Sequence, residues 1–151
     1  AFTRRLIRLR RSHVVLHRSR FFLGAKVPGT NVKDVVWLRP DGREMNDEDW
    51  GFGPAKALGL LLSGEAGLMH LTRRGDPEPD DTFLLLMNAG HEPLSWRLPP
   101  VGEDRWRLIV DTGEEAAPAR RVRPRPLRRA LEVPPRTLLL LMRVSAQQAD
   151  R

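Results

Sequence analysis

The sequence contains no cysteine, and its apolar residues form only short runs. Without thiols there is no disulfide framework, no thiolate nucleophile and no cysteine-ligated zinc site, and a cysteine-free chain fits a reducing compartment. The apolar runs fall short of the roughly 18 residues that a membrane span requires. Arginines stand where a signal peptide would carry its apolar segment. We therefore expect a cytoplasmic protein without a membrane partner, with room in 151 residues for one compact domain and an added helix.

Acidic residues are missing where the arginines gather, and the net charge is +7. The arginines lie in two segments, and the second, "PARRVRPRPLRR", holds no aromatic residue for stacking on bases. A charged helix face and a solvated loop explain them, so nucleic-acid binding is the less favoured alternative. The two groups are Arg4, Arg5, Arg8, Arg10, Arg11, Arg18 and Arg20, and Arg120, Arg121, Arg123, Arg125, Arg128 and Arg129.

The opening segment "AFTRRLIRLRRSHVVLHRS" has the pattern of an amphipathic helix. Phe2, Leu6, Leu9 and Leu16 fall near one face, and arginines fall on the other. Thr3 is the one plausible early cap, and cations fill the first turn, where the helix dipole prefers anions. We expect a helix cut from a larger structure, with an apolar stripe that needs a partner.

The rest of the chain reads as short strands. "VKDVVWL" is a β-branched strand closed by the turn "RPDG", with Pro40 at the second turn position. "ALGLLLSG" is ambiguous between a short helix and a strand, and its glycines favour a buried strand. "TFLLLMNA", "LSWRLP", "RWRLIVDT" and "RTLLLLMRV" follow at short intervals with turn residues between them. This spacing predicts a mainly β fold, an antiparallel β-sandwich preceded by one helix.

The passage "REMNDEDW" gathers several acids before Trp50, and a glycosidase needs two carboxylates facing each other across the scissile bond. Adjacent acids rarely meet that need. We interpret the passage as a capped turn whose carboxylates accept backbone N–H bonds, with Trp50 folded onto the core. The acids concerned are Glu44, Asp47, Glu48 and Asp49.

His13 and His17 stand four residues apart, a spacing that places two imidazoles on one helix face. Neither a third ligand nor a zincin glutamate accompanies them, so we interpret both as surface histidines. The sequence thus predicts no catalytic residue, no cofactor-binding residue and no metal ligand.

Six passages together resemble the carboxy-terminal portion of bacterial glycogen debranching enzymes of the isoamylase type, in the alpha-amylase clan of glycoside hydrolases. They are "LIRLRRSHVVL", "FFLG", "KDVVWLRPDGREMNDEDW", "ALGLLLSG", "DDTFLLLMNAGHEPLSWRLP" and "WRLIVDT". The resemblance follows the order of the chain and is weakest around residues 119–129. Where the family usually has His-Pro-Val-Leu, this sequence has His13-Val14-Val15-Leu16.

The resemblance implies that residues 1–20 match the last helix of a catalytic TIM barrel and residues 21–151 the β-sandwich domain that follows it. The family's aspartate nucleophile, glutamate acid/base and stabilising aspartate lie upstream in the barrel, whose chemistry is hydrolysis of α-1,6 branch linkages in glycogen. No residue here matches a catalytic motif, so we expect an inactive C-terminal fragment whose partners are the missing upstream barrel and, through the parent enzyme, branched α-glucan.

Trp50 and Trp96 are the candidate glycan contacts, although a tryptophan in a strand-rich domain usually belongs to the core. Two alternatives stay open at this point. The chain could be a stand-alone carbohydrate-binding module, which would hold glycogen without a barrel, or a basic nucleic-acid binder, whose affinity would fall steeply with salt.

Overall fold

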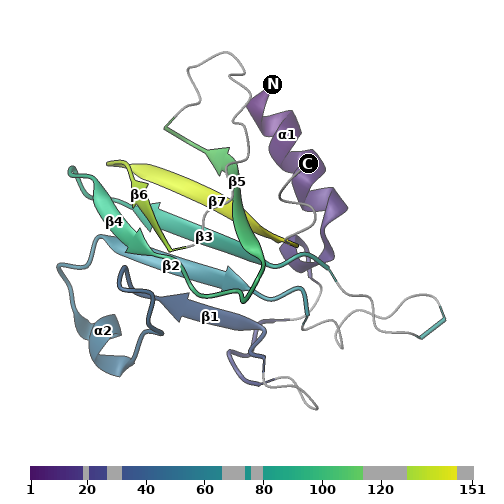
Figure 1. Ribbon diagram of the computed structural model, residues 1–151, viewed down its shortest axis with the longest axis horizontal. Helices are drawn as coiled ribbons and strands as arrows, with labels where there is room; N and C mark the ends of the chain where they lie inside the picture. Colours follow the sequence, from purple (N-terminus) through teal and green to yellow (C-terminus); the bar gives the residue numbers. More distant parts are fainter. Residues whose placement is uncertain (19–20, 27–31, 66–73, 76–79, 114–128, 146–151) are drawn as a thin grey trace. The chain divides into compact units, whose positions relative to one another are not determined.

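The computed structural model describes residues 1–18, 21–26, 32–65, 74–75, 80–113 and 129–145. This part of the chain is mainly β, as the sequence predicts (Figure 1). Its elements are α1 (Phe2–Ser12), the 3-10 turn η1 (Val14–Leu16), β1 (Val35–Leu38), α2 (Asp47–Gly51), β2 (Ala57–Leu62), β3 (Phe83–Asn88), β4 (Leu94–Arg97), β5 (Arg105–Asp111), β6 (Ala130–Val133) and β7 (Thr137–Val144).

The strands form two sheets. The larger has the order β1-β2-β3-β7-β5, and in the smaller β4 pairs with β6. The β4–β6 pair is antiparallel with Trp96 opposite Leu131, and the antiparallel β5–β7 pair carries an irregularity between Leu108 and Val110. Such a bulge bends the strand and increases its twist. Antiparallel pairing in two sheets confirms the fold class that the sequence predicts.

The chain divides into two compact units. The first comprises Ala1–Val36 and Leu62–Phe83, and the second comprises Trp37–Leu61 and Leu84–Arg151. The boundary between residues 20 and 21 that the family resemblance implies remains a prediction.

Alternation of burial along β7 shows how the second unit forms its core. Leu139 and Leu141 are 1% and 0% exposed, whereas Leu140 between them is half-buried. A strand directs successive side chains to opposite faces, so a leucine-rich strand can bury one face completely. Trp96 of β4 and Trp106 of β5 are also fully buried, as expected for strand tryptophans.

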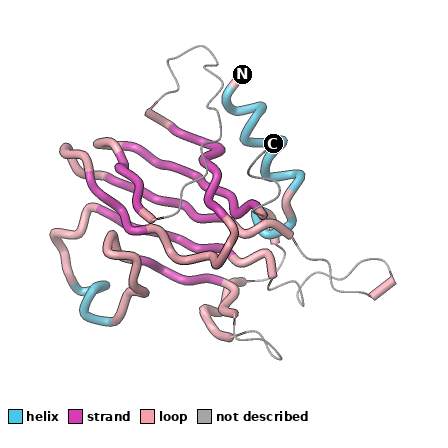
Figure 2. Tube along the Cα trace, in the orientation of Figure 1, coloured by secondary structure: helices cyan, strands magenta, loops and turns pink. Residues whose placement is uncertain are grey.

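The opening helix is shorter than its sequence pattern suggests. The α-helix ends at Ser12, His13 is extended with φ −127° and ψ 112°, and a single 3-10 turn follows (Figure 2). The backbone N–H of Val15 donates to Asp80 Oδ2 at 2.8 Å and not to a carbonyl one helical turn earlier. An acid distant in sequence therefore caps a new turn where the periodicity predicted continued helix. The expected cap is also wrong, because Ala1 occupies the N-cap position without a side-chain hydrogen bond.

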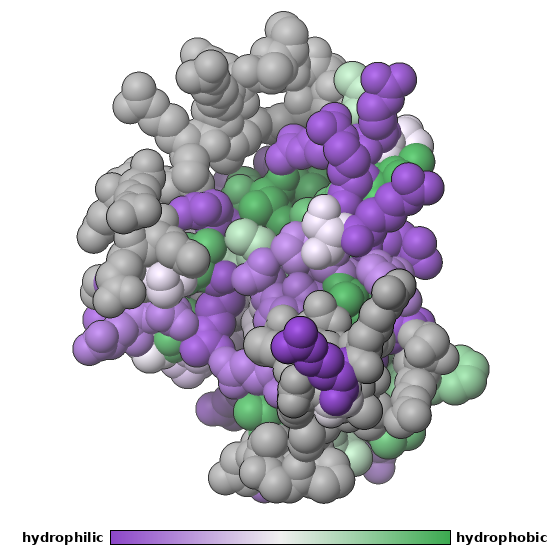
Figure 3. Space-filling model, turned by 90° about the vertical axis from the view of Figure 1, so that its right-hand side faces the viewer, coloured by the Kyte–Doolittle hydropathy of each residue, from purple (hydrophilic) through white to green (hydrophobic). Residues whose placement is uncertain are grey.

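The amphipathic character of α1 is confirmed. Its five arginines are exposed, and Phe2, Leu6 and Leu9 are half-buried. Hydrophilic side chains likewise dominate the described part of the face drawn in Figure 3, with smaller hydrophobic areas among them. No described helix is long and apolar enough to cross a membrane.

The strand predictions hold for "VVWL", for "ALGLLLSG" and for the four later passages, which become β1, β2, β3, β4, β5 and β7. The "RPDG" turn is also confirmed, since Gly42 N donates to Arg39 O at 2.9 Å and Gly42 has a φ of +82°. The sequence reasoning missed β6, whose four residues "ALEV" follow directly on the arginine-rich segment.

Candidate functional site

The acid-rich passage is capped, as predicted, but it forms the short helix α2 and not a turn. Asn46 is the N-cap of α2, and its side-chain oxygen accepts the N–H of Asp49 at 3.0 Å. In return, Asp49 Oδ2 accepts the N–H of Asn46 at 2.9 Å, which completes a capping box. Asp47, Glu48 and Asp49 fill the first turn, where the helix dipole favours negative charge.

Asp49 also belongs to an ion-pair network around Arg39. The Arg39 guanidinium contacts Asp41 at 2.5 Å and Asp49 at 3.2 Å. Its hydrogen bond lowers the pKa of Asp41, and the N–H of Asn46, followed by Arg39, lowers the pKa of Asp49. The hydrogen bonds to Asp41 and Asp49 raise the pKa of Arg39. A general acid needs a raised pKa, so these carboxylates have the electrostatics of structural anions.

The two tryptophans proposed as glycan contacts have opposite environments. Trp96 is 0% exposed, so its ring cannot stack on a sugar, and that candidate is wrong. Trp50 is 54% exposed, which corrects the expectation that it folds onto the core. Its ring meets that of Trp37 edge-on, with centroids 5.5 Å apart and an interplanar angle of 78°. Trp37 is itself 36% exposed, so the pair offers aromatic surface to solvent.

A pocket of about 420 Å³ lies in the second unit, and some of its lining residues are close to Trp37 and Trp50 in the sequence. Its lining includes Arg39, Asp49, Phe52, Lys56, His91 and Leu94. Phe52 directly follows α2 and is 61% exposed, which makes it a third accessible ring. Apolar faces with a few polar groups are typical of small-ligand sites. We name Trp37, Trp50 and Phe52 the aromatic surface.

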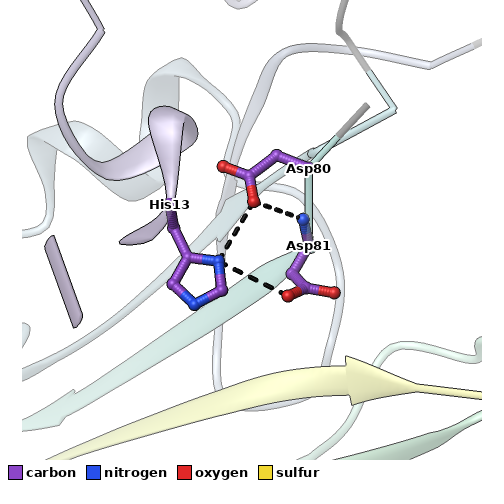
Figure 4. Close-up of side chains that lie close together, drawn as sticks. All are labelled: His13, Asp80 and Asp81. Carbon is purple, nitrogen blue, oxygen red and sulfur yellow. Dashed lines mark hydrogen bonds and ion pairs between the residues drawn. The ribbon is translucent and has the colours of Figure 1, made fainter. Parts of the chain in front are cut away.

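His13 is neither paired with His17 on a helix face nor exposed at the surface. It stands outside α1, its side chain is only 16% exposed, and its structural partners are Asp80 and Asp81, so the prediction of a surface histidine is wrong here (Figure 4). His17 is exposed, in keeping with that prediction. His13 Nδ1 is 3.0 Å from Asp80 Oδ1 and 3.4 Å from Asp81 Oδ2. We name these three residues the His13 cluster.

Asp34 and Arg18 form a buried ion pair in the first unit. Asp34 is 1% exposed and accepts the N–H groups of Leu23 and Gly24, each at 3.0 Å. Its Oδ2 is also 3.5 Å from Nη1 of Arg18, whose side chain is 4% exposed and stacks over Phe22 at 4.2 Å. Arg18 therefore does not belong to the charged, solvated helix face that was expected for the opening arginines. It fixes the segment that follows η1.

Sequence patterns carry little information about these two sites. Asp80 and Asp81 are adjacent acids directly before the strand passage "TFLLLMNA". Their partner His13 lies 67 residues away from Asp80, too far for any spacing rule. The second arginine group lies in residues 114–128, apart from Arg129, and so falls outside the described residues.

No family model matches this chain. Among curated proteins, it is 39% identical over 116 residues to the glycogen operon protein GlgX homologue of Mycobacterium bovis (strain ATCC BAA-935 / AF2122/97) and, equally, to those of two Mycobacterium tuberculosis strains. The match covers 76% of this chain but only 16% of each relative. It confirms the resemblance to a carboxy-terminal portion of a glycogen debranching enzyme.

Proposed function

We propose that this chain is the non-catalytic carboxy-terminal domain of a glycogen debranching enzyme of the isoamylase type. The observation that carries the proposal is the 39% identity to GlgX homologues, of which the match spans 16%. In this proposal residues 1–20 complete the catalytic barrel, residues 21–151 form the following domain, and the upstream region of the same polypeptide is the partner. The cysteine-free composition fits the cytoplasm as its compartment.

The parent enzyme hydrolyses α-1,6 branch linkages in glycogen, and the proposal assigns that chemistry to the upstream region. Retaining hydrolysis requires a carboxylate nucleophile and a second carboxyl group that is protonated at working pH. The pKa values of Asp49 in the acid-rich passage and of Asp41 in the turn before it are lowered, and both carboxylates are engaged by Arg39. These groups support a structural role for the passage.

Exposed apolar side chains in the first unit support a stabilising role. Phe21 is 92% exposed, Leu23 is 69% exposed, and Ile7 of α1 is 48% exposed. Burial of such surface contributes about 25 cal/mol per Å². Covering these residues with the upstream region would thus stabilise both parts of the longer protein, which is the role that we propose.

Two measurements test this proposal. The purified chain should release no reducing sugar from glycogen, whereas the full-length mycobacterial relative should. Deleting the matching region from that relative should lower its unfolding temperature and its yield of active protein. Debranching by the chain alone, or an unchanged unfolding temperature after the deletion, would contradict the assignment.

The aromatic surface favours one second candidate, a carbohydrate-binding module that acts without a barrel. Trp50 and Phe52 are more than half exposed, and rings of this kind can stack on sugar faces. Such a module should be retained by immobilised glycogen in the absence of any catalytic region. Passage through the gel at the rate of an unrelated basic protein would eliminate it.

A further inference from the structure

Three potential metal ligands converge in the His13 cluster from two segments distant in sequence. His13 follows α1, and Asp80 and Asp81 precede β3. Each residue offers one ligand atom, and all three atoms lie within 4.8 Å of one another. Figure 4 shows the imidazole and both carboxylates directed toward the same point.

The spacing of the ligand atoms fits a coordination shell. His13 Nδ1 is 3.0 Å from Asp80 Oδ1 and 3.4 Å from Asp81 Oδ2. Zinc binds nitrogen and carboxylate oxygen at about 2.0–2.2 Å, and ligands of one tetrahedral ion then lie about 3.3–3.6 Å apart. The separations of His13 Nδ1 from the two carboxylate oxygens are therefore close to those of ligands that share one ion.

Hydrogen bonds within the cluster cannot join His13 Nδ1 to both carboxylates at once. A neutral imidazole carries at most one proton on Nδ1, so it can donate to only one carboxylate at a time. Two carboxylates nevertheless face this nitrogen. A divalent cation would accept lone pairs from all three groups and offset the paired negative charges.

The surrounding backbone holds the ligands in place. Asp80 Oδ1 accepts the N–H of Asp81 at 2.7 Å, and Oδ2 accepts the N–H of Val15 at 2.8 Å. Asp80 N donates to Gly64 O at 3.1 Å, and a Cβ on Gly64 would lie only 1.9 Å from the Asp80 carbonyl oxygen. Carboxylates that ligate a metal are regularly held in place by hydrogen bonds of this kind from outer-shell groups.

The ring of His13 is also fixed, and one side of the cluster remains open. Its edge-to-face contact with Phe83 has a centroid distance of 4.9 Å and an interplanar angle of 75°. Asp80 is 13% exposed, but Asp81 is 48% exposed, so solvent reaches the cluster at Asp81. A three-ligand site with an accessible fourth position suits Zn²⁺, which accepts both imidazole nitrogen and carboxylate oxygen.

We propose that His13, Asp80 and Asp81 form a Zn²⁺-binding site that clamps the end of α1 to the segment preceding β3. The site is independent of the proposed glycogen role, and the sequence alone predicted no metal ligand. Its consequence is a metal-dependent gain in the stability of the first unit, because an ion that binds only the folded state stabilises that state.

Calorimetric titration of the full chain with zinc chloride tests the proposal. The wild type should bind one equivalent with a Kd in about the micromolar range or tighter. His13→Gln and Asp81→Asn should weaken binding by at least about tenfold. His17→Gln, an exposed histidine from the same segment, and Glu103→Gln, an exposed acid, should bind like the wild type. Circular dichroism checks that each variant is folded.

Two further readouts separate coordination from a purely structural role of these side chains. Zn²⁺ should raise the unfolding temperature of the wild type and of H17Q but leave that of D81N unchanged. Chelation of the ion with EDTA should also return the unfolding temperature of the wild type to its metal-free value. Absence of binding by the wild type, equal binding by folded D81N, or loss of binding in H17Q would overturn the proposal.

Discussion

The indole of Trp96 lies against Gly59 of β2, so close that a Cβ on Gly59 would come within 2.7 Å of Trp96 Cζ2. The same Cβ would be 3.0 Å from the Cβ of Leu38. A glycine in a strand interior often marks such a close approach. The smaller sheet thus places its tryptophan on the larger sheet where no side chain stands between them.

The first prediction concerns this contact. Gly59→Ala should destabilise the fold by about 1–3 kcal/mol, because the added methyl group meets the rigid indole and the strand of Leu38. Urea unfolding followed by tryptophan fluorescence measures the change. Gly53→Ala is the matched control, since nothing lies within 4 Å of a Cβ there, and it should shift stability by less than about 0.5 kcal/mol. Equal stability of the two variants would refute the close packing.

The second prediction concerns the buried pair of Asp34 and Arg18. Asp34→Ala should cost about 3–5 kcal/mol, because it leaves the guanidinium of Arg18 buried without its carboxylate. The change also removes the acceptor for two backbone N–H groups. Denaturant titration against Asp47→Ala, an exposed acid, measures the difference. A loss no larger than that of the control would contradict the burial of the pair.

The third prediction concerns acid stability. The folded state lowers the pKa of Asp41, chiefly through Arg39, and that of Asp49, chiefly through the N–H of Asn46. Their contribution is therefore complete above the unfolded pKa of about 3.9 and is lost as the pH falls through the lowered folded values. The urea midpoint of the wild type should drop as the pH is lowered from about 5 to about 2.

Variants test whether Asp41 and Asp49 cause this loss of stability at low pH. Asp41→Asn with Asp49→Asn should show a smaller drop than the wild type over this pH range, because neither amide titrates. Asp47→Asn, at an exposed position of the same helix, should follow the wild type. A double variant with the full wild-type drop would show that the Arg39 network does not contribute to acid sensitivity.

The fourth prediction concerns the aromatic surface. If the chain binds glycogen, Trp50→Ala should weaken retention by up to about tenfold, the range expected from the loss of one stacking ring. Affinity electrophoresis in gels with and without glycogen measures retention. Phe21→Ala removes an aromatic ring that is 92% exposed in the other unit, and it should leave retention unchanged. Equal losses of retention in both variants would indicate nonspecific adsorption to glycogen and not a binding site.

Local physics explains where the sequence predictions succeeded. The N-cap Asn46 and its partner Asp49 are three residues apart, and the Arg39–Gly42 turn is closed by one hydrogen bond, so neighbouring residues alone specify both. Strands β3 and β7 carry apolar residues in strand-length runs with turn residues between them, and these runs also need no distant information.

The sequence by itself determined the mainly β class, the capped turn and the resemblance to part of a debranching enzyme, because short-range spacing and ordered motifs carry that information. Only the tertiary structure decided which tryptophan is buried and which is exposed, since Trp96 and Trp50 differ in neighbours and not in chemistry. It also ended α1 at Ser12 and joined His13 to Asp80. Hydrogen bonds across 65 and 67 residues form only when folding brings those segments together, and no local periodicity encodes them.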